Sequence, residues 1–132
     1  ALVIRSDALR RDFRYLIKQR GGLLAKGRLL GVQFDTLFTD DLYLRIGRHA
    51  VTQALRIRDA FRAHGCEFLY DSPTNQQFPI LSSEVLAELG KDFAYSPWEK
   101  VDENRTAVRF CTSWATKAED VDTLIAALDR VL

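Results

Sequence analysis

Arg109 lies in the middle of an apolar stretch, residues 106–112, whose side chains alternate as in a β-strand. Val108 and Phe110 point to one face of that strand, and Arg109 and Cys111 point to the other. A guanidinium keeps its charge, so its burial requires an anionic partner. Two interpretations stay open: a surface or salt-bridged arginine on the wet face of a sheet, or a clamp for a small carboxylate held on a rigid element.

The N-terminal part of the chain carries a local excess of positive charge. Its basic side chains face only Asp7 and Asp12, and they are Arg5, Arg10, Arg11, Arg14, Lys18, Arg20, Lys26 and Arg28. Such a run is typical of a solvated helix face, with a phosphate or nucleic-acid contact as the alternative. The net charge of the whole chain is only +1, so we expect neither nucleic acid nor an anionic membrane as a partner.

Lys26 stands between Ala25 and Gly27, where a Schiff-base lysine could be seated. Such a lysine must be desolvated, or lie near another cation, to be neutral at pH 7. Arg28 is near in sequence, but the surrounding residues look exposed. A phosphate-binding or structural role therefore fits Lys26 better than Schiff-base chemistry.

The histidines and cysteines show no metal-binding pattern. His49 and His64 are too far apart on one predicted helix to form a ligand pair. Cys66 and Cys111 have neither the spacing of a zinc site nor a disulfide framework, which favours a reducing cytoplasm. We therefore expect no metal and a cytoplasmic protein.

Length and composition predict one sizeable core, because the chain has 132 residues of which 47% are hydrophobic. No apolar stretch is long enough to span a bilayer. The chain contains no methionine and opens on Ala1-Leu2-Val3-Ile4, a run that resembles the middle of a β-strand. We expect this sequence to be a piece of a longer protein.

The N-terminal half is predicted to be helical. Ser6-Asp7 is a good N-cap pair for a helix that ends at Gly21-Gly22, and a second helical stretch covers residues 23–38. Thr39-Asp40-Asp41 caps the longest helix, residues 42–64, which would be about 35 Å long at 1.5 Å per residue.

From residue 66 the pattern changes to β-β-α-β-β-α, with strands over 67–70, 76–81, 93–98 and 106–112. Pro79 inside the second strand indicates an edge position or a bulge. Ser82-Ser83 begins the first helix, and the capping box of residues 116–119 begins the last one. The fold class is therefore α+β: N-terminal helices including one long helix, then a small, mainly antiparallel sheet with helices on one face.

Three segments together resemble the C-terminal part of the β-eliminating lyase and threonine aldolase family. They are RYLIKQRGGLLAKGRLLGVQF, SPTNQQFPIL and AVRFCTSWATKAEDVDTLIAAL. These enzymes use pyridoxal phosphate and have the aspartate-aminotransferase type of fold. The resemblance implies that residues 1–38 are the end of the large cofactor domain, 39–65 the connecting helix and 66–132 the small C-terminal α+β domain.

The resemblance also implies roles for particular residues. The cofactor lysine of the family precedes the strand that corresponds to residues 1–4, so this chain would lack it, would not bind the cofactor covalently and would be inert alone. Arg109 matches the arginine that grips the α-carboxylate of the amino-acid substrate. Arg20, Lys26 and Arg28 are candidates for the cofactor phosphate or the subunit boundary of a homo-oligomer.

The sequence leaves the reaction open between retro-aldol cleavage and β-elimination. In threonine aldolases the arginine-bearing strand continues with a Thr-His pair, which Thr112-Ser113 replaces here. The second hypothesis is a non-catalytic binding or assembly module that uses the basic N-terminal helix as its contact surface.

Overall fold

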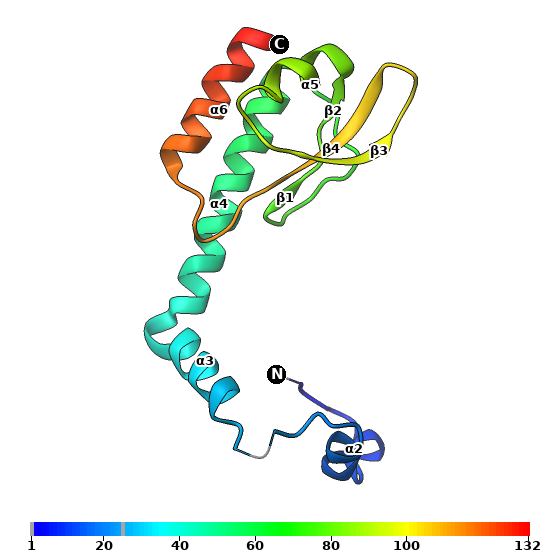
Figure 1. Ribbon diagram of the computed structural model, residues 1–132, viewed down its shortest axis with the longest axis vertical. Coiled ribbons are helices and arrows are strands. Elements are labelled where there is room, and N and C mark those ends of the chain that lie inside the picture. The colour runs from blue at the N-terminus through cyan, green and yellow to red at the C-terminus, as the bar shows by residue number, and fades with distance from the viewer. Residues whose placement is uncertain (1, 25) are drawn as a thin grey trace. The chain divides into compact units, whose positions relative to one another are not determined.

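The computed structural model describes residues 2–24 and 26–132, and the chain divides into two compact units. The first unit extends to Asp40, and the second is Asp41–Leu132. Within the described residues, no helix combines the length and the apolar character needed to cross a membrane. The two units are described separately (Figure 1).

The first unit contains three helices, α1 (Asp7–Arg10), α2 (Phe13–Gln19) and α3 (Arg28–Phe38). The single helix predicted from Ser6-Asp7 to Gly21 is broken in two, because Asp12 has the left-handed backbone conformation, with φ 57°. None of the three helices contains a buried residue. The apolar side chains on these helices therefore do not form a buried core within the described residues of this unit.

Two expectations for the first unit differ from the structure. Leu2–Ile4 pairs with no described residue of this chain, and Ala1 lies outside the described residues, so a strand here in the sheet of a longer protein stays a prediction. A strand needs a hydrogen-bonding neighbour, and a run of apolar residues alone does not supply one. The helix predicted from residue 23 begins at Arg28, because Gly27 has a positive φ of 64° and sets the start.

The long helix of the second unit, α4 (Leu42–Ala63), is preceded by a short 3-10 turn, η1 (Thr39–Asp41). The predicted cap is wrong: Thr39 donates its hydroxyl to the carbonyl oxygen of Asp35 at 2.7 Å, and no side chain caps α4. The buried residues of α4 all lie from its ninth residue onward: Ala50, Gln53, Ala54, Ile57 and Phe61. Residues 42–49, the first two turns of the helix, are half-buried or exposed.

The sheet is antiparallel and is built around β4 (Arg105–Cys111). On one side β4 pairs with β1 (Gln76–Gln77) and β2 (Ile80–Ser82), and on the other side it pairs with β3 (Ser96–Lys100). The single strand predicted over 76–81 is instead interrupted at Phe78 and Pro79, where the sequence indicated an edge position or a bulge. The strand predicted over 67–70 is reduced to a single bridge between Phe68 and Pro79.

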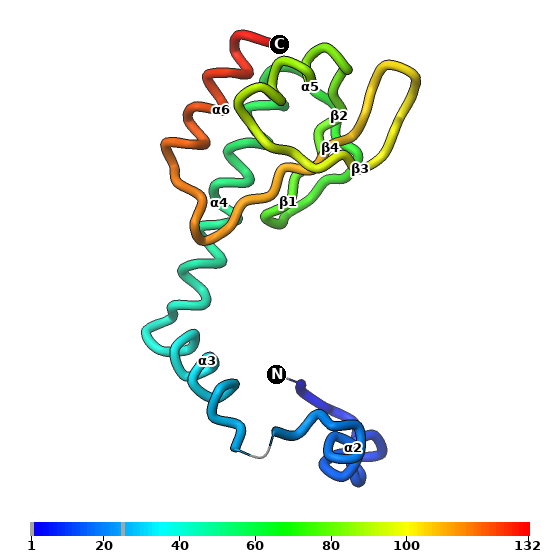
Figure 2. The backbone as a smooth tube through the Cα atoms, in the orientation of Figure 1, coloured from blue at the N-terminus to red at the C-terminus, as the bar shows by residue number. Residues whose placement is uncertain are grey.

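Helices α5 (Ser83–Leu89) and α6 (Ala118–Val131) complete the second unit. Helix α6 lies beside α4, and Figure 2 traces the β3–β4 hairpin away from this pair. Ser82 caps α5 by accepting from the backbone N–H of Val85 at 3.3 Å. The capping box predicted at Thr116 is wrong, because α6 begins after Lys117 and the Thr116 hydroxyl accepts from the N–H of Ser113 instead.

The core of the second unit lies between the sheet and the helices. Its most deeply buried members include Phe61 of α4, Val108 of β4 and Leu128 of α6, each with 0% of its surface exposed. Phe61 also meets Phe110 of β4, with ring centroids 5.4 Å apart. The predicted α+β class, with a small antiparallel sheet and helices, is confirmed.

Candidate functional site

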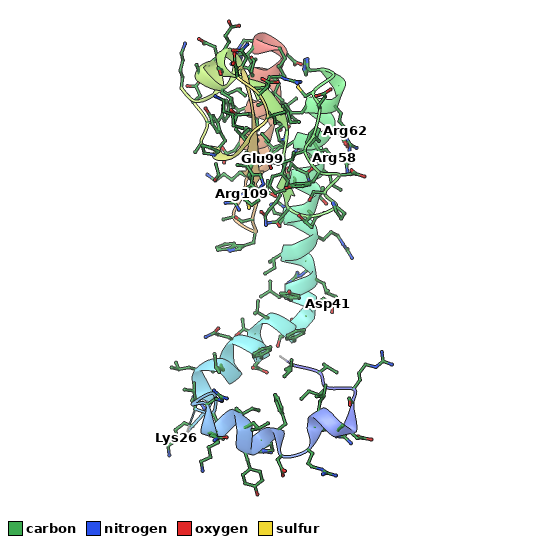
Figure 3. The ribbon with its side chains drawn as sticks, turned by 90° about the vertical axis from the view of Figure 1, so that its right-hand side faces the viewer. Lys26, Asp41, Arg58, Arg62, Glu99 and Arg109 are labelled. Carbon is green, nitrogen blue, oxygen red and sulfur yellow. The ribbon has the colours of Figure 1, made fainter. Side chains whose placement is uncertain are left out.

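Arg109 occupies the central strand of the sheet, and both neighbouring strands reach its side chain. Ser96 of β3 is its register partner, and Gln76 of β1 is opposite Cys111, two residues further along β4. Val108 and Phe110 enter the helix-covered core, so alternation places Arg109 on the opposite face. Figure 3 labels this half-buried residue on the sheet.

The guanidinium of Arg109 has two neutral neighbours and no carboxylate. Its Nη1 donates to Gln76 Oε1 at 3.3 Å, and its Cζ lies 5.3 Å from the centre of the Trp98 ring. Its Nε is buried without an acceptor among the described residues. Among the described residues, neither Glu99, opposite Ala107 on the neighbouring strand, nor any other carboxylate forms an ion pair with Arg109. The positive charge is therefore not neutralised within the described part of the chain.

Arg105, at the start of the same strand, shows the contrasting arrangement. Its Nε donates to Asp102 Oδ2 at 2.7 Å, and its Nη1 donates to Glu67 Oε2 at 3.0 Å. The hydrogen bond from Arg105, followed by that from the backbone N–H of Asn104, holds the pKa of Asp102 below its ordinary value. β4 thus carries one arginine that is fully paired and one that has spare donors.

The end of β4 is fastened to the rest of the unit by Thr112. The Thr112 N–H donates to the carbonyl oxygen of Asn75 at 3.0 Å, and the Asn75 side-chain amide donates to the carbonyl oxygen of Thr112 at 2.7 Å. The Thr112 hydroxyl donates to the carbonyl oxygen of Ala50 in α4. Thr112, which directly precedes the departure from the Thr-His pair at Ser113, therefore has a structural role that sequence reasoning missed.

A shallow groove of about 460 Å³ runs along the first half of α4 and past the end of β4. Ser113 and Trp114 line it on one side, and 72% of the Trp114 surface is exposed. The remaining lining residues are Tyr43, Leu44, Ile46, Gly47, Arg48, Ala50 and Asn75. The groove does not include Arg109.

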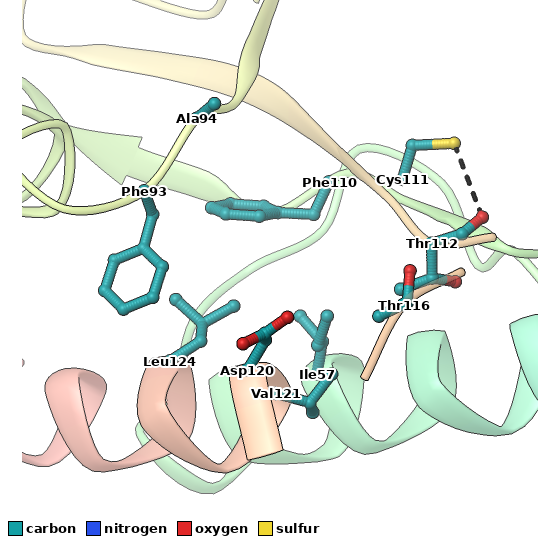
Figure 4. A pocket seen from close by; sticks show the side chains of 10 residues that line it. All are labelled: Ile57, Phe93, Ala94, Phe110, Cys111, Thr112, Thr116, Asp120, Val121 and Leu124. Atoms are coloured by element: carbon teal, nitrogen blue, oxygen red, sulfur yellow. Dashed lines mark hydrogen bonds between the residues drawn. The ribbon is translucent and has the colours of Figure 1, made fainter. Parts of the chain in front are cut away.

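A smaller cavity of about 150 Å³ lies between β4 and α6 (Figure 4). Phe93, Phe110 and Leu124 are among the residues that line it, and the Asp120 carboxylate from the first turn of α6 also faces it. The Cys111 thiol points to the carbonyl oxygen of Thr112 at 3.9 Å. The cavity is a gap on the helix-covered side of the sheet and is separate from Arg109.

Arg20, Lys26 and Arg28 are all exposed and belong to the first unit. Arg20 follows α2, Lys26 lies in the connecting turn, and Arg28 begins α3. No described contact gathers them around a common point, and Lys26 lacks the burial that a Schiff-base lysine needs. The assignment of these three residues to the cofactor phosphate or the subunit boundary stays a prediction.

Both histidines have structural partners. His49 donates through Nε2 to the carbonyl oxygen of Thr116 at 2.7 Å, which ties α4 to the segment before α6. His64 Nε2 lies 3.0 Å from Asp129 Oδ1. Among the residues that the structure describes, no group of three or more histidines, cysteines or acids could hold a metal ion.

Comparison with solved structures finds a similar protein. The chain is 39% identical to a threonine aldolase from Leishmania major, with a TM-score of 0.86 over 96% of its own length. It spans only 37% of that solved chain. No family model matches the chain, and no curated protein matches it significantly. The resemblance to threonine aldolases that the sequence motifs indicated is confirmed.

Proposed function

We propose that this chain is a C-terminal portion of a threonine aldolase-like, pyridoxal-phosphate-dependent lyase, to which it contributes the arginine that binds the substrate. Arg109 would hold the α-carboxylate of an amino acid while the rest of the enzyme supplies the cofactor and its lysine. The portion would be inert alone. The observation that carries the proposal is the uncompensated charge of Arg109 on the central strand of a threonine aldolase-like unit.

The chemistry of Arg109 suits a carboxylate. A guanidinium donates two parallel hydrogen bonds to the two oxygens of a carboxylate, which fixes both the position and the orientation of the bound acid. The Nη1 of Arg109 has one long hydrogen bond to an amide, and its Nε has none. A charged acceptor at the donors that these contacts leave free would therefore bind favourably.

The position of Arg109 on β4 would also fix the orientation of the bound substrate. The side chain starts from the middle of a three-stranded ladder whose end is tied to α4 by Thr112. A carboxylate held there would present the substrate's α-carbon in one fixed direction, which lowers the entropic part of the barrier. Pyridoxal phosphate, when bound in the longer enzyme, would act as the electron sink for the bond that is cleaved.

The exposed apolar side chains of the first unit support the proposal that the longer enzyme covers this unit. Its three helices contain no buried residue, and the large apolar side chains on their surface are Leu9, Tyr15, Leu16, Leu29, Leu30, Val32, Phe34 and Phe38. Soluble proteins rarely leave so much apolar surface uncovered. The cofactor domain of the longer enzyme, or another subunit of a homo-oligomer, would cover it.

The test is Arg109→Ala in the full-length enzyme, assayed with L-threonine and with a β-substituted amino acid. Loss of a bidentate charged contact, worth about 2–3 kcal/mol, should raise the Michaelis constant about 30- to 150-fold. Arg105→Ala is the matched control, because it removes an arginine from the same strand whose charge is already paired. Unchanged Michaelis constant and turnover in Arg109→Ala would overturn the proposal.

A further inference from the structure

The contacts of Arg109 come from two flanking strands, and each contact restrains a different part of the guanidinium. Gln76 on β1 engages Nη1, and the ring of Trp98 on β3 lies against the guanidinium. A free arginine side chain loses rotamer entropy when a ligand fixes it in one conformation. An arginine that is already held in place loses less of it when a ligand arrives.

Trp98 is in an unusual place in the sheet. Pro97 is opposite Val108 and Glu99 is opposite Ala107, so the register shifts and Trp98 is the extra residue between them. Such β-bulges redirect a side chain and are frequent beside active sites. The Trp98 ring also meets Phe78 edge-on at 5.1 Å, while 47% of the residue's surface remains exposed. The ring is thus braced on one side and faces the guanidinium on another.

The neutrality of both neighbours matters as much as their position. A carboxylate at the place of Gln76 would satisfy Arg109 internally, as Asp102 and Glu67 satisfy Arg105. An amide oxygen and an aromatic face hold the guanidinium without cancelling its charge. The pair therefore restrains Arg109 and leaves it available to an incoming anion.

We infer that Gln76 and Trp98 are positioning residues for Arg109, which hold its guanidinium between two strands and keep it uncompensated for the carboxylate of the substrate. This inference rests on the proposed function of Arg109. Neither residue is placed in contact with the substrate. Both act through the arginine, so their effect should be on carboxylate binding and not on the chemical step.

The decisive variant is Gln76→Glu in the full-length enzyme. A carboxylate there would pair with Arg109 and compete with the substrate, so the Michaelis constant should rise about 10- to 100-fold, the scale of a charged hydrogen bond, with turnover at saturation largely kept. Asn104→Asp is the control, because it makes the same amide-to-carboxylate change on the exposed turn before β4. The control should leave the Michaelis constant unchanged.

Trp98 is tested by a pair of substitutions. Trp98→Leu removes the aromatic face and should raise the Michaelis constant about 3- to 20-fold, whereas Trp98→Phe keeps a ring and should restore most of the affinity. Calorimetric titration with a non-reacting amino-acid analogue gives the same comparison without turnover. Rescue by phenylalanine separates positioning from a general loss of structure.

The outcomes distinguish the two proposals. If Arg109→Ala weakens binding but Gln76→Glu and Trp98→Leu bind the analogue as the wild type does, Arg109 is the clamp and the positioning role is wrong. If Arg109→Ala itself has no effect, the proposed function fails and the inference fails with it. If Gln76→Glu lowers turnover and leaves binding intact, the positioning role is also wrong.

Discussion

The Thr112 hydroxyl donates a hydrogen bond of 2.7 Å to the main-chain carbonyl oxygen of Ala50, in the middle of α4. Thr112 is 3% exposed, so this bond lies in the interior. It joins the end of the arginine-bearing strand to the long helix across 62 positions of sequence. This contact therefore fixes the C-terminal end of β4, and with it the position of the strand that carries Arg109.

Thr112→Val should lower the free energy of unfolding by about 1–2 kcal/mol, because valine keeps the shape but removes a buried hydrogen bond. Thr123→Val is the control, since the Thr123 hydroxyl makes only a local, exposed bond to the carbonyl oxygen of Glu119. Urea denaturation measures both. An equal loss of stability in the two variants would contradict a special role for the Ala50 contact.

Periodicity predicted the second unit well because its elements bury the faces that the pattern marks. The long helix was expected over 42–64 and is Leu42–Ala63, and the arginine strand was expected over 106–112 and is Arg105–Cys111. Periodicity failed in the first unit, where no described partner covers the apolar stripe and Asp12 breaks the helix. Without tertiary burial, local backbone preferences decide the structure.

The site was predicted only in part, for a physical reason. The alternation of β4 placed Arg109 on the face away from the core, as the structure shows. Its partners Gln76 and Trp98 lie far away in sequence or depend on a register shift, and a single sequence carries no signal for either. The assignment of Arg109 to a substrate carboxylate, and of Arg20, Lys26 and Arg28 to the cofactor phosphate or subunit boundary, remain predictions.

We expect the free energy of unfolding to depend strongly on Leu128, which lies in the core of the second unit. Leu128→Ala in α6 removes a fully buried side chain from among Phe61 and Val108 and should cost about 2–5 kcal/mol. Leu132→Ala is the matched control, because 46% of the Leu132 surface is exposed. Its cost should stay within about 0.5 kcal/mol. Thermal and urea unfolding both report the difference, and similar losses would show that the core does not centre on α6.

The two cysteines should differ in reactivity. Burial raises the pKa of the Cys66 thiol, so less of the reactive thiolate is present at neutral pH, whereas Cys111 is exposed. Alkylation of the native protein by iodoacetamide at pH 7.5 should therefore modify Cys111 first. The Cys111→Ser variant should lose the fast phase, and peptide mapping identifies the modified residue. Faster labelling of Cys66 would show that its environment opens readily.

We expect the ionised carboxylate of Asp102 to stabilise the folded state, and this stabilisation to be lost in acid. Hydrogen bonds from Arg105 and from the backbone N–H of Asn104 lower its pKa in the folded state below the ordinary value of 3.8. The unfolded chain therefore binds a proton at a higher pH than the folded chain does. The stabilisation is complete above the unfolded pKa and is lost as the pH falls through the folded one.

Thermal unfolding of the wild type and of Asp102→Asn between pH 7 and pH 2 tests this. Above about pH 5 the wild type should have the higher Tm by a constant margin, because the ionised carboxylate keeps its bond to Arg105. Below about pH 4 the margin should shrink, since protonation makes the wild type resemble the amide variant. Glu67→Gln should change this acid limb less, because Glu67 makes a single bond to Arg105 while Asp102 also binds two backbone N–H groups. A margin that stayed constant down to pH 2 would mean that the charge of Asp102 contributes nothing, and that only the shape of the turn stabilises the hairpin that leads into β4.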